Sequence, residues 1–86
     1  MDLETIKNIM DNYYQYIMIS SLKYATGIGT YASYDIAAFD IFHRRIDDIV
    51  FDVTADRNKA LRIIEKFNRY QLSPIHLEEA ILDAIV

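Results

Sequence analysis

Apolar residues recur through the first two thirds of the chain at alternating steps of three and four positions. This spacing is that of one face of an α-helix, so it predicts helices over residues 3–25 and 34–53. Residues 49–53 also have strand propensity, which leaves an irregular or strand-like segment there as an alternative to a helix continuous through His43. The first row comprises Leu3, Ile6, Met10, Tyr13, Ile17 and Tyr24, and the second comprises Ile36, Phe39, His43, Ile46, Val50 and Val53.

Residues that favour helix ends support this division. Gly27 tolerates the left-handed conformation that closes a helix, so it is the predicted end of the first one. Ser33 is a predicted N-cap of the second helix.

Two further helices are expected in the remainder of the chain. Thr54 or Asp56 can cap a helix over 56–70, and Ser73 followed by Pro74 predicts another over 74–85. The expected fold is therefore all-α, a compact bundle of about four helices, in a single helical domain over residues 1–86.

Composition narrows the classes of function. The chain has no cysteine, so it contains neither disulfides nor a thiolate zinc site. Acids near the N-terminus argue against a signal peptide, and no apolar run approaches the ~20 residues that span a bilayer. A cytoplasmic protein that does not bind membranes is expected. The net charge of −4 makes nucleic acid an improbable partner.

Candidate catalytic residues are sparse. His43 and His76 are the only two histidines, and His43 lies on the apolar row of the second predicted helix. Gly27-Ile28-Gly29 lacks the third glycine and the Lys-Ser/Thr of a phosphate-binding loop. We therefore expect no enzyme activity, no cofactor and no metal.

Charged side chains form two groups. Asp40, Asp47 and Asp48 could imitate a row of phosphates, although Arg44 lies four residues from both Asp40 and Asp48 and can pair with them. A basic edge formed by Arg62, Lys66 and Arg69 on the third predicted helix is the one feature that favours nucleic-acid binding.

Tyrosine is the most informative residue type. The chain contains seven tyrosines in 86 residues, and 52% of all residues are hydrophobic. Tyrosine is enriched at protein interfaces, and Tyr14 and Tyr16 cannot share one helix face. A homodimer and a foreign partner are therefore expected. The predicted partner-binding residues are Tyr14, Tyr16, Tyr31, Tyr34, Asp40, Asp47 and Asp48.

The segment 21–31, which reads SLKYATGIGTY, resembles a motif of small, mostly uncharacterised phage and prophage proteins. Their pattern is roughly ALRYALGRRTY, and two of its arginines are replaced here by Ile28 and Gly29. The resemblance implies an origin in a mobile genetic element, where small acidic proteins commonly inhibit host proteins. The matching residues are Leu22, Tyr24, Ala25, Gly27, Thr30 and Tyr31.

The leading hypothesis is therefore a phage-encoded protein that binds and inhibits a bacterial host protein, such as a defence nuclease or CRISPR effector. An immunity protein or antitoxin that neutralises a cognate toxin is the first alternative. A small nucleic-acid-binding regulator is the second.

Overall fold

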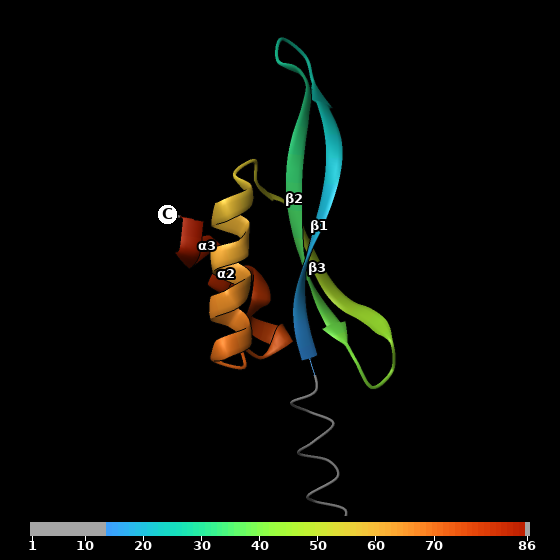
Figure 1. Ribbon diagram of the computed structural model, residues 1–86, viewed down its shortest axis with the longest axis vertical. Coiled ribbons are helices and arrows are strands. Elements are labelled where there is room, and N and C mark those ends of the chain that lie inside the picture. Colours follow the sequence, from blue (N-terminus) through green and yellow to red (C-terminus); the bar gives the residue numbers. More distant parts are fainter. Residues whose placement is uncertain (1–13, 86) are drawn as a thin grey trace, which may run out of the picture.

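The computed structural model describes residues 14–85 and contains a three-stranded antiparallel sheet followed by helices (Figure 1). The predicted all-α bundle is therefore wrong, and the fold is α+β. The strands, in the order β1-β2-β3 across the sheet, are β1 (Tyr14–Ala25), β2 (Gly29–Asp40) and β3 (Arg45–Thr54). The helices are α2 (Arg57–Arg69), the short 3-10 helix η1 (Pro74–His76) and α3 (Leu77–Ile85).

The predicted helix over 3–25 is wrong from residue 14 onward, because these residues form β1; residues 3–13 lie outside the described part. Every second residue of β1 from Tyr14 to Tyr24, apart from Ser20, is large and apolar. That period of two matches a strand, and β-branched and aromatic side chains favour the extended backbone. The pairing of β1 with β2 continues without a bulge from Tyr14–Asp40 to Ala25–Gly29.

The predicted helix over 34–53 is also wrong. Its residues form most of β2, the connection 41–44 and most of β3. Ser33, the predicted N-cap, is instead buried within β2. The strand-like alternative for 49–53 is confirmed, since these residues belong to β3.

Gly27 lies in a hairpin turn and not at a helix end. The Ile28 N–H donates to the Ala25 carbonyl at 3.1 Å, and Gly27 and Gly29 adopt φ values of 85° and 87°. Such positive values strain residues that carry a side chain, so glycine is favoured at both positions. Gly27 therefore adopts the predicted left-handed conformation, but in the turn between β1 and β2 and not at the end of a helix.

The two C-terminal helices are confirmed. Asp56 caps α2 by accepting the Asn58 and Lys59 N–H groups at 3.0 and 3.2 Å. Pro74 begins the second helical segment, where its missing N–H costs no hydrogen bond. Both helices have one apolar face, which explains why their pattern was recognisable in the sequence.

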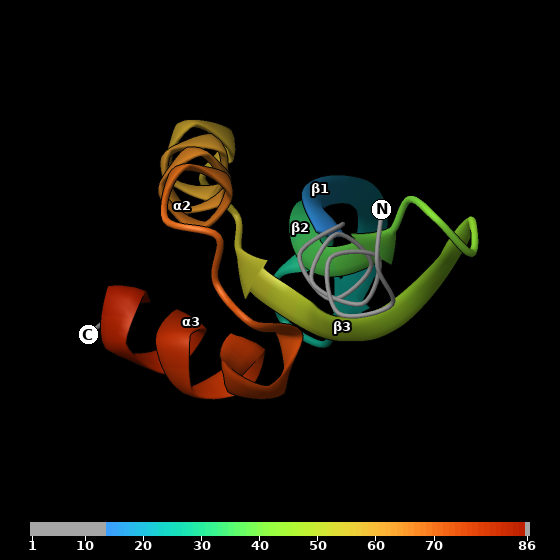
Figure 2. The ribbon, with the colours of Figure 1, turned by 90° about the horizontal axis from the view of Figure 1, so that it is seen from below.

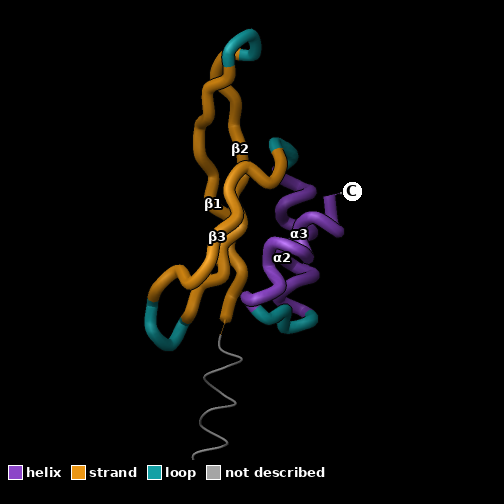
Figure 3. The backbone as a smooth tube through the Cα atoms, turned by 180° about the vertical axis from the view of Figure 1, so that it is seen from behind, coloured by secondary structure: helices purple, strands orange, loops and turns teal. Residues whose placement is uncertain are grey.

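The core lies between one face of the sheet and the two helices (Figures 2 and 3). Tyr16 of β1 packs edge-on against Phe67 of α2, with ring centroids 5.5 Å apart. Because residues alternate between the two faces of a strand, the even-numbered residues of β1 and β2 point towards the helices. The core residues are Tyr16, Ile36, Ala38, Ile63, Phe67, Leu77 and Ile81.

The far part of the β1–β2 hairpin projects beyond the helices (Figures 1 and 3). We call residues 20–34 the arm. Leu22 and Tyr24 on the helix-side face of the arm are 74% and 75% exposed, and Ile28 at its tip is 75% exposed. Beyond the pairing of Tyr34 with Thr54 the arm is a ribbon of two strands, and α2 and α3 do not cover these apolar side chains.

Candidate protein interface

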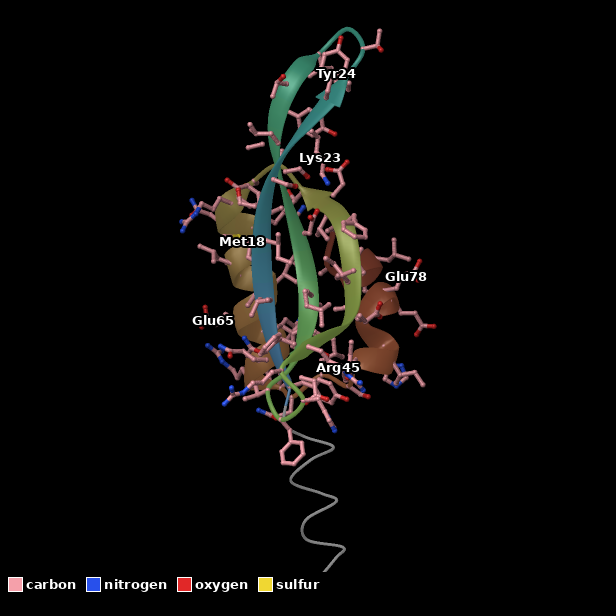
Figure 4. All side chains as sticks on the ribbon, turned by 90° about the vertical axis from the view of Figure 1, so that its right-hand side faces the viewer. Met18, Lys23, Tyr24, Arg45, Glu65 and Glu78 are labelled. Atoms are coloured by element: carbon pink, nitrogen blue, oxygen red, sulfur yellow. The ribbon has the colours of Figure 1, made fainter. Side chains whose placement is uncertain are left out.

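The helices cover one face of the sheet and leave the opposite face open (Figure 4). Cross-strand partners share a face, so the register assigns the odd-numbered residues of β1 and β2 to this open face. Ala37 pairs with Ile17 of β1 and Ile49 of β3, while Phe39 pairs with Ile46. The open face therefore includes side chains from all three strands.

The lower half of the open face is apolar. Ala37 is fully buried at its centre, and Ile46 at its margin is 46% exposed. Solvated faces of antiparallel sheets usually carry polar side chains, so this composition makes the open face a candidate interface. We call it the apolar patch, and it comprises Ile17, Ile19, Ala37, Phe39, Ile46 and Ile49.

A polar cluster lies above the apolar patch, around Asp52. This residue adopts a φ of 55°, where β3 bulges away from regular pairing between Tyr34 and Ile36. Its carboxylate accepts hydrogen bonds from the Ser33 hydroxyl and, at 3.2 Å, from the Tyr31 hydroxyl. Its N–H donates to buried Asp35 at 2.7 Å. The cluster thus holds the bulge against β2.

Lys23 borders the same cluster. Its Nζ lies 3.9 Å from Asp35 Oδ1 and 5.6 Å from the centre of the Phe51 ring. Partial burial and the neighbouring Asp52 carboxylate raise the pKa of Tyr31, so its hydroxyl stays protonated to a higher pH than an ordinary tyrosine. These contacts account for the polar side chains structurally.

Asp40 and His43 form a second polar pair at the opposite end of the sheet. Asp40 accepts the His43 backbone N–H at 3.0 Å, and its other oxygen lies 2.7 Å from His43 Nδ1. The backbone N–H of His43 is the main cause of a lowered pKa of Asp40, and the His43 side chain lowers it further. The pair links the end of β2 to the connection between β2 and β3, in which Arg44 takes a φ of 55°.

The predicted partner-binding residues do not form one surface. Tyr16 is a core residue whose hydroxyl donates to the Leu72 carbonyl at 2.6 Å. Tyr14 and Tyr34 are half-buried on the helix-side face, whereas Tyr31 lies on the open face.

The three predicted aspartates also differ in environment. Asp40 is buried, Asp47 pairs with Arg45 at 2.9 Å, and Asp48 is exposed and accepts the Ile49 N–H at 2.9 Å. They flank the β2–β3 connection and do not line up as a row of phosphates.

The apolar patch and the arm were missed by the sequence interpretation. The signal was the alternation within residues 14–24, together with two glycines in the following turn. Had these residues been assigned to strands, Ile17 and Ile19 would have shared a face opposite Tyr16.

Among residues 14–85, no three His, Cys, Asp or Glu side chains gather in a way that could hold a metal ion. A shallow hollow between α2 and α3 is lined by Phe67, Tyr70, Leu72 and Ala84, with Lys66 and Asp83 at its rim. Within the same residues, no helix is long and apolar enough to cross a membrane.

Comparisons with protein families, with curated proteins and with solved structures gave no match.

Proposed function

We propose that this chain is a non-catalytic, protein-binding module that covers a surface of a bacterial protein with the open face of its sheet. The apolar patch carries this proposal, because three strands present large apolar side chains on the face that α2 and α3 do not cover. An origin in a mobile genetic element, action in the cytoplasm and inhibition of the bound protein are parts of the same proposal.

The charged side chains of β2, β3 and their connection indicate which kind of partner surface would complement the sheet. Of the acids from β2 through β3, Asp47, Asp48 and Asp52 are exposed, while Asp35 and Asp40 are buried. The exposed bases of this segment are Arg44 and Arg45. A partner surface that is apolar in the centre and lined by lysine and arginine complements this sheet. The nucleic-acid channel of a defence nuclease has that character, which makes such a nuclease the preferred target.

Site-specific photo-crosslinking in bacterial cells tests the proposal. A photoreactive residue at position 46 should capture one protein reproducibly, while the same residue at position 82 should not. Ile46 and Leu82 are matched, since they are 46% and 53% exposed, but Leu82 lies on α3.

The captured protein is then purified and titrated. Ile46→Asp should weaken its binding by at least about tenfold, because the aspartate would be buried unpaired, and Leu82→Asp should leave it unchanged. Equal capture at both positions, or equal binding by both variants, contradicts the proposal. Capture of a toxin in place of a defence protein would identify the chain as an immunity protein or antitoxin.

A second candidate function, nucleic-acid binding, is favoured by α2. This helix carries five bases against Glu65. Within the described residues Arg69 pairs with Glu65 at 2.5 Å, whereas Arg57, Arg62 and Lys66 form no ion pair. A gel shift decides between the candidates, because binding through these bases must weaken as salt rises and must be lost in Arg62→Glu.

A further inference from the structure

Within residues 14–85, the outer edge of β1 has no neighbouring strand, since β1 pairs only with β2. At Tyr16 this edge is occupied by the side-chain amide of Asn68, which accepts the Tyr16 N–H at 2.8 Å and donates to the Tyr16 carbonyl at 3.2 Å. The backbone groups of Tyr16 therefore point away from β2. Because this direction alternates along a strand, those of Met18, Ser20, Leu22 and Tyr24 point the same way.

Beyond Tyr16 the edge is available for pairing. Within residues 14–85, the outward backbone groups of Leu22 and Tyr24 have no hydrogen-bond partner. Proteins commonly protect such edges with proline, bulges or clustered charge. From position 18 to position 25 there is no proline and no bulge, and Lys23 is the one charged residue.

We propose that the arm edge of β1 pairs with the same edge of a second copy of this chain, antiparallel and centred on Leu22. This self-association goes beyond the proposed function and uses a different surface from the apolar patch. The exposed apolar side chains of the arm favour a second copy as the occupant, because pairing brings Leu22 against its counterpart and buries both. Tyr24 then lies opposite Ser20 of the other chain.

The charge of Lys23 selects this register. Centring the pairing on Lys23 would place two ammonium groups directly opposite each other, and centring it on Ser21 would place Lys23 opposite apolar Ile19. Centring it on Leu22 places Lys23 opposite Ser21 of the second copy. Each Lys23 then faces a neutral polar residue and can keep its contact with Asp35 of its own chain.

The pairing has a consequence for the open face. Paired residues of an antiparallel sheet point to the same side, so the dimer would be a continuous sheet of six strands with all helices on one side. Both apolar patches would then lie together on the other side. The dimer would present two equivalent binding surfaces in one direction, which allows bivalent binding.

Cysteine crosslinking tests the pairing directly, because the chain has no cysteine of its own. Directly opposed residues in a hydrogen-bonded pair have Cα atoms about 5.5 Å apart, which suits a disulfide. Leu22→Cys should therefore form a disulfide-linked dimer on mild oxidation. Tyr70→Cys and Ile75→Cys are the matched controls, since these residues are 70% and 83% exposed but lie outside the arm; they should remain monomeric.

Light scattering supplies a second readout. The wild-type chain should show twice its mass of 10.1 kDa as concentration rises. Leu22→Lys combined with Tyr24→Lys should weaken the dimer by more than about tenfold, because large apolar side chains would be replaced by facing charges. Tyr70→Lys with Ile75→Lys makes the same change in charge and should have no effect.

Amide exchange identifies the edge itself. The N–H groups of Leu22 and Tyr24 should exchange slowly in the dimer and quickly in the double-lysine variant of the arm. A wild-type monomer at all soluble concentrations overturns the proposal, as does a dimer that survives the arm lysines. Ile46→Asp should leave the dimer intact, so failure of partner binding and failure of self-association are distinguishable.

Discussion

The side chain of Asn68 at the end of α2 takes the place of a fourth strand at Tyr16, by making one hydrogen bond to its N–H and one to its carbonyl. Asn68→Ala should lower the free energy of unfolding by about 1–3 kcal/mol, because both backbone groups would lose a partner in a partly buried position. Urea unfolding measures this. Arg69→Ala, which removes an exposed pair with Glu65, should change it by less than about 1 kcal/mol. An equal effect of both variants would contradict the assigned role.

The Tyr16 hydroxyl connects the sheet to the segment between the helices. It donates to the Leu72 carbonyl at 2.6 Å. Tyr16→Phe keeps the ring packed against Phe67 but removes this bond, so it should cost about 1 kcal/mol of stability at neutral pH. Tyr24→Phe is the control, since Tyr24 is 75% exposed, and it should be neutral within the error of a urea titration.

Alkaline pH should reverse the order of stability of wild type and Tyr16→Phe. Burial, assisted by Tyr14 and Asp48, raises the pKa of Tyr16 to about 12, against 10.0 ordinarily. A raised folded-state pKa gives stability that is fully present below about pH 10 and is lost as pH rises towards 12. The loss is about 2 kcal/mol, larger than the hydroxyl contribution. Urea titrations of both proteins from pH 9 to 12 measure the difference; parallel curves would contradict it.

The Asp40–His43 pair should govern part of the response to acid. Because the pKa of Asp40 is lowered, chiefly by the His43 N–H, its contribution is present above the ordinary value of 3.8 and is lost as pH falls below it. Asp40→Asn keeps an acceptor for that N–H but cannot gain a proton. The stability advantage of wild type over this variant should therefore shrink below pH 4. An advantage independent of pH would exclude the carboxylate as its source.

The turn at the tip of the arm should tolerate a residue type at position 27 according to how readily that residue adopts a positive φ. Nothing lies within 4 Å of a Cβ built on Gly27, and its φ is 85°. Gly27→Ala should therefore cost about 1 kcal/mol through strain alone, and Gly27→Asn should cost less, since asparagine tolerates positive φ. Amide exchange along residues 20–34 measures the difference locally. If alanine and asparagine behave alike, conformational strain does not determine the stability of the turn.

The C-terminal part of the fold was predictable because its signals are local. Asp56 caps α2 and Pro74 begins η1 through contacts with residues two to four positions away. Each helix buries one face only, so a period of 3.6 is visible in the sequence.

The sheet was not predicted because its strands are apolar on both faces. Ile17, Met18 and Ile19 follow one another in β1, and Ile36, Ala37 and Ala38 are all buried in β2. Such runs fit a helical row as well as a strand when Ser20 interrupts the alternation. The apolar patch depends on a register between residues far apart in the chain, and the β3 bulge at Asp52 shifts that register. Local alternation groups Ile17 with Ile19, but it does not encode which residues of β2 and β3 lie beside them.

The projecting arm also affects how the molecule moves through solution. Strands of 12 residues extend about 40 Å, far more than the width of the helical layer, so the chain experiences more friction than a sphere of equal mass. Gel filtration separates proteins by hydrodynamic radius, so even a monomer of this chain should elute with globular standards of larger mass. Early elution from such a column would therefore reflect the elongated shape and would not show a dimer. The number of copies requires a mass measured independently of diffusion.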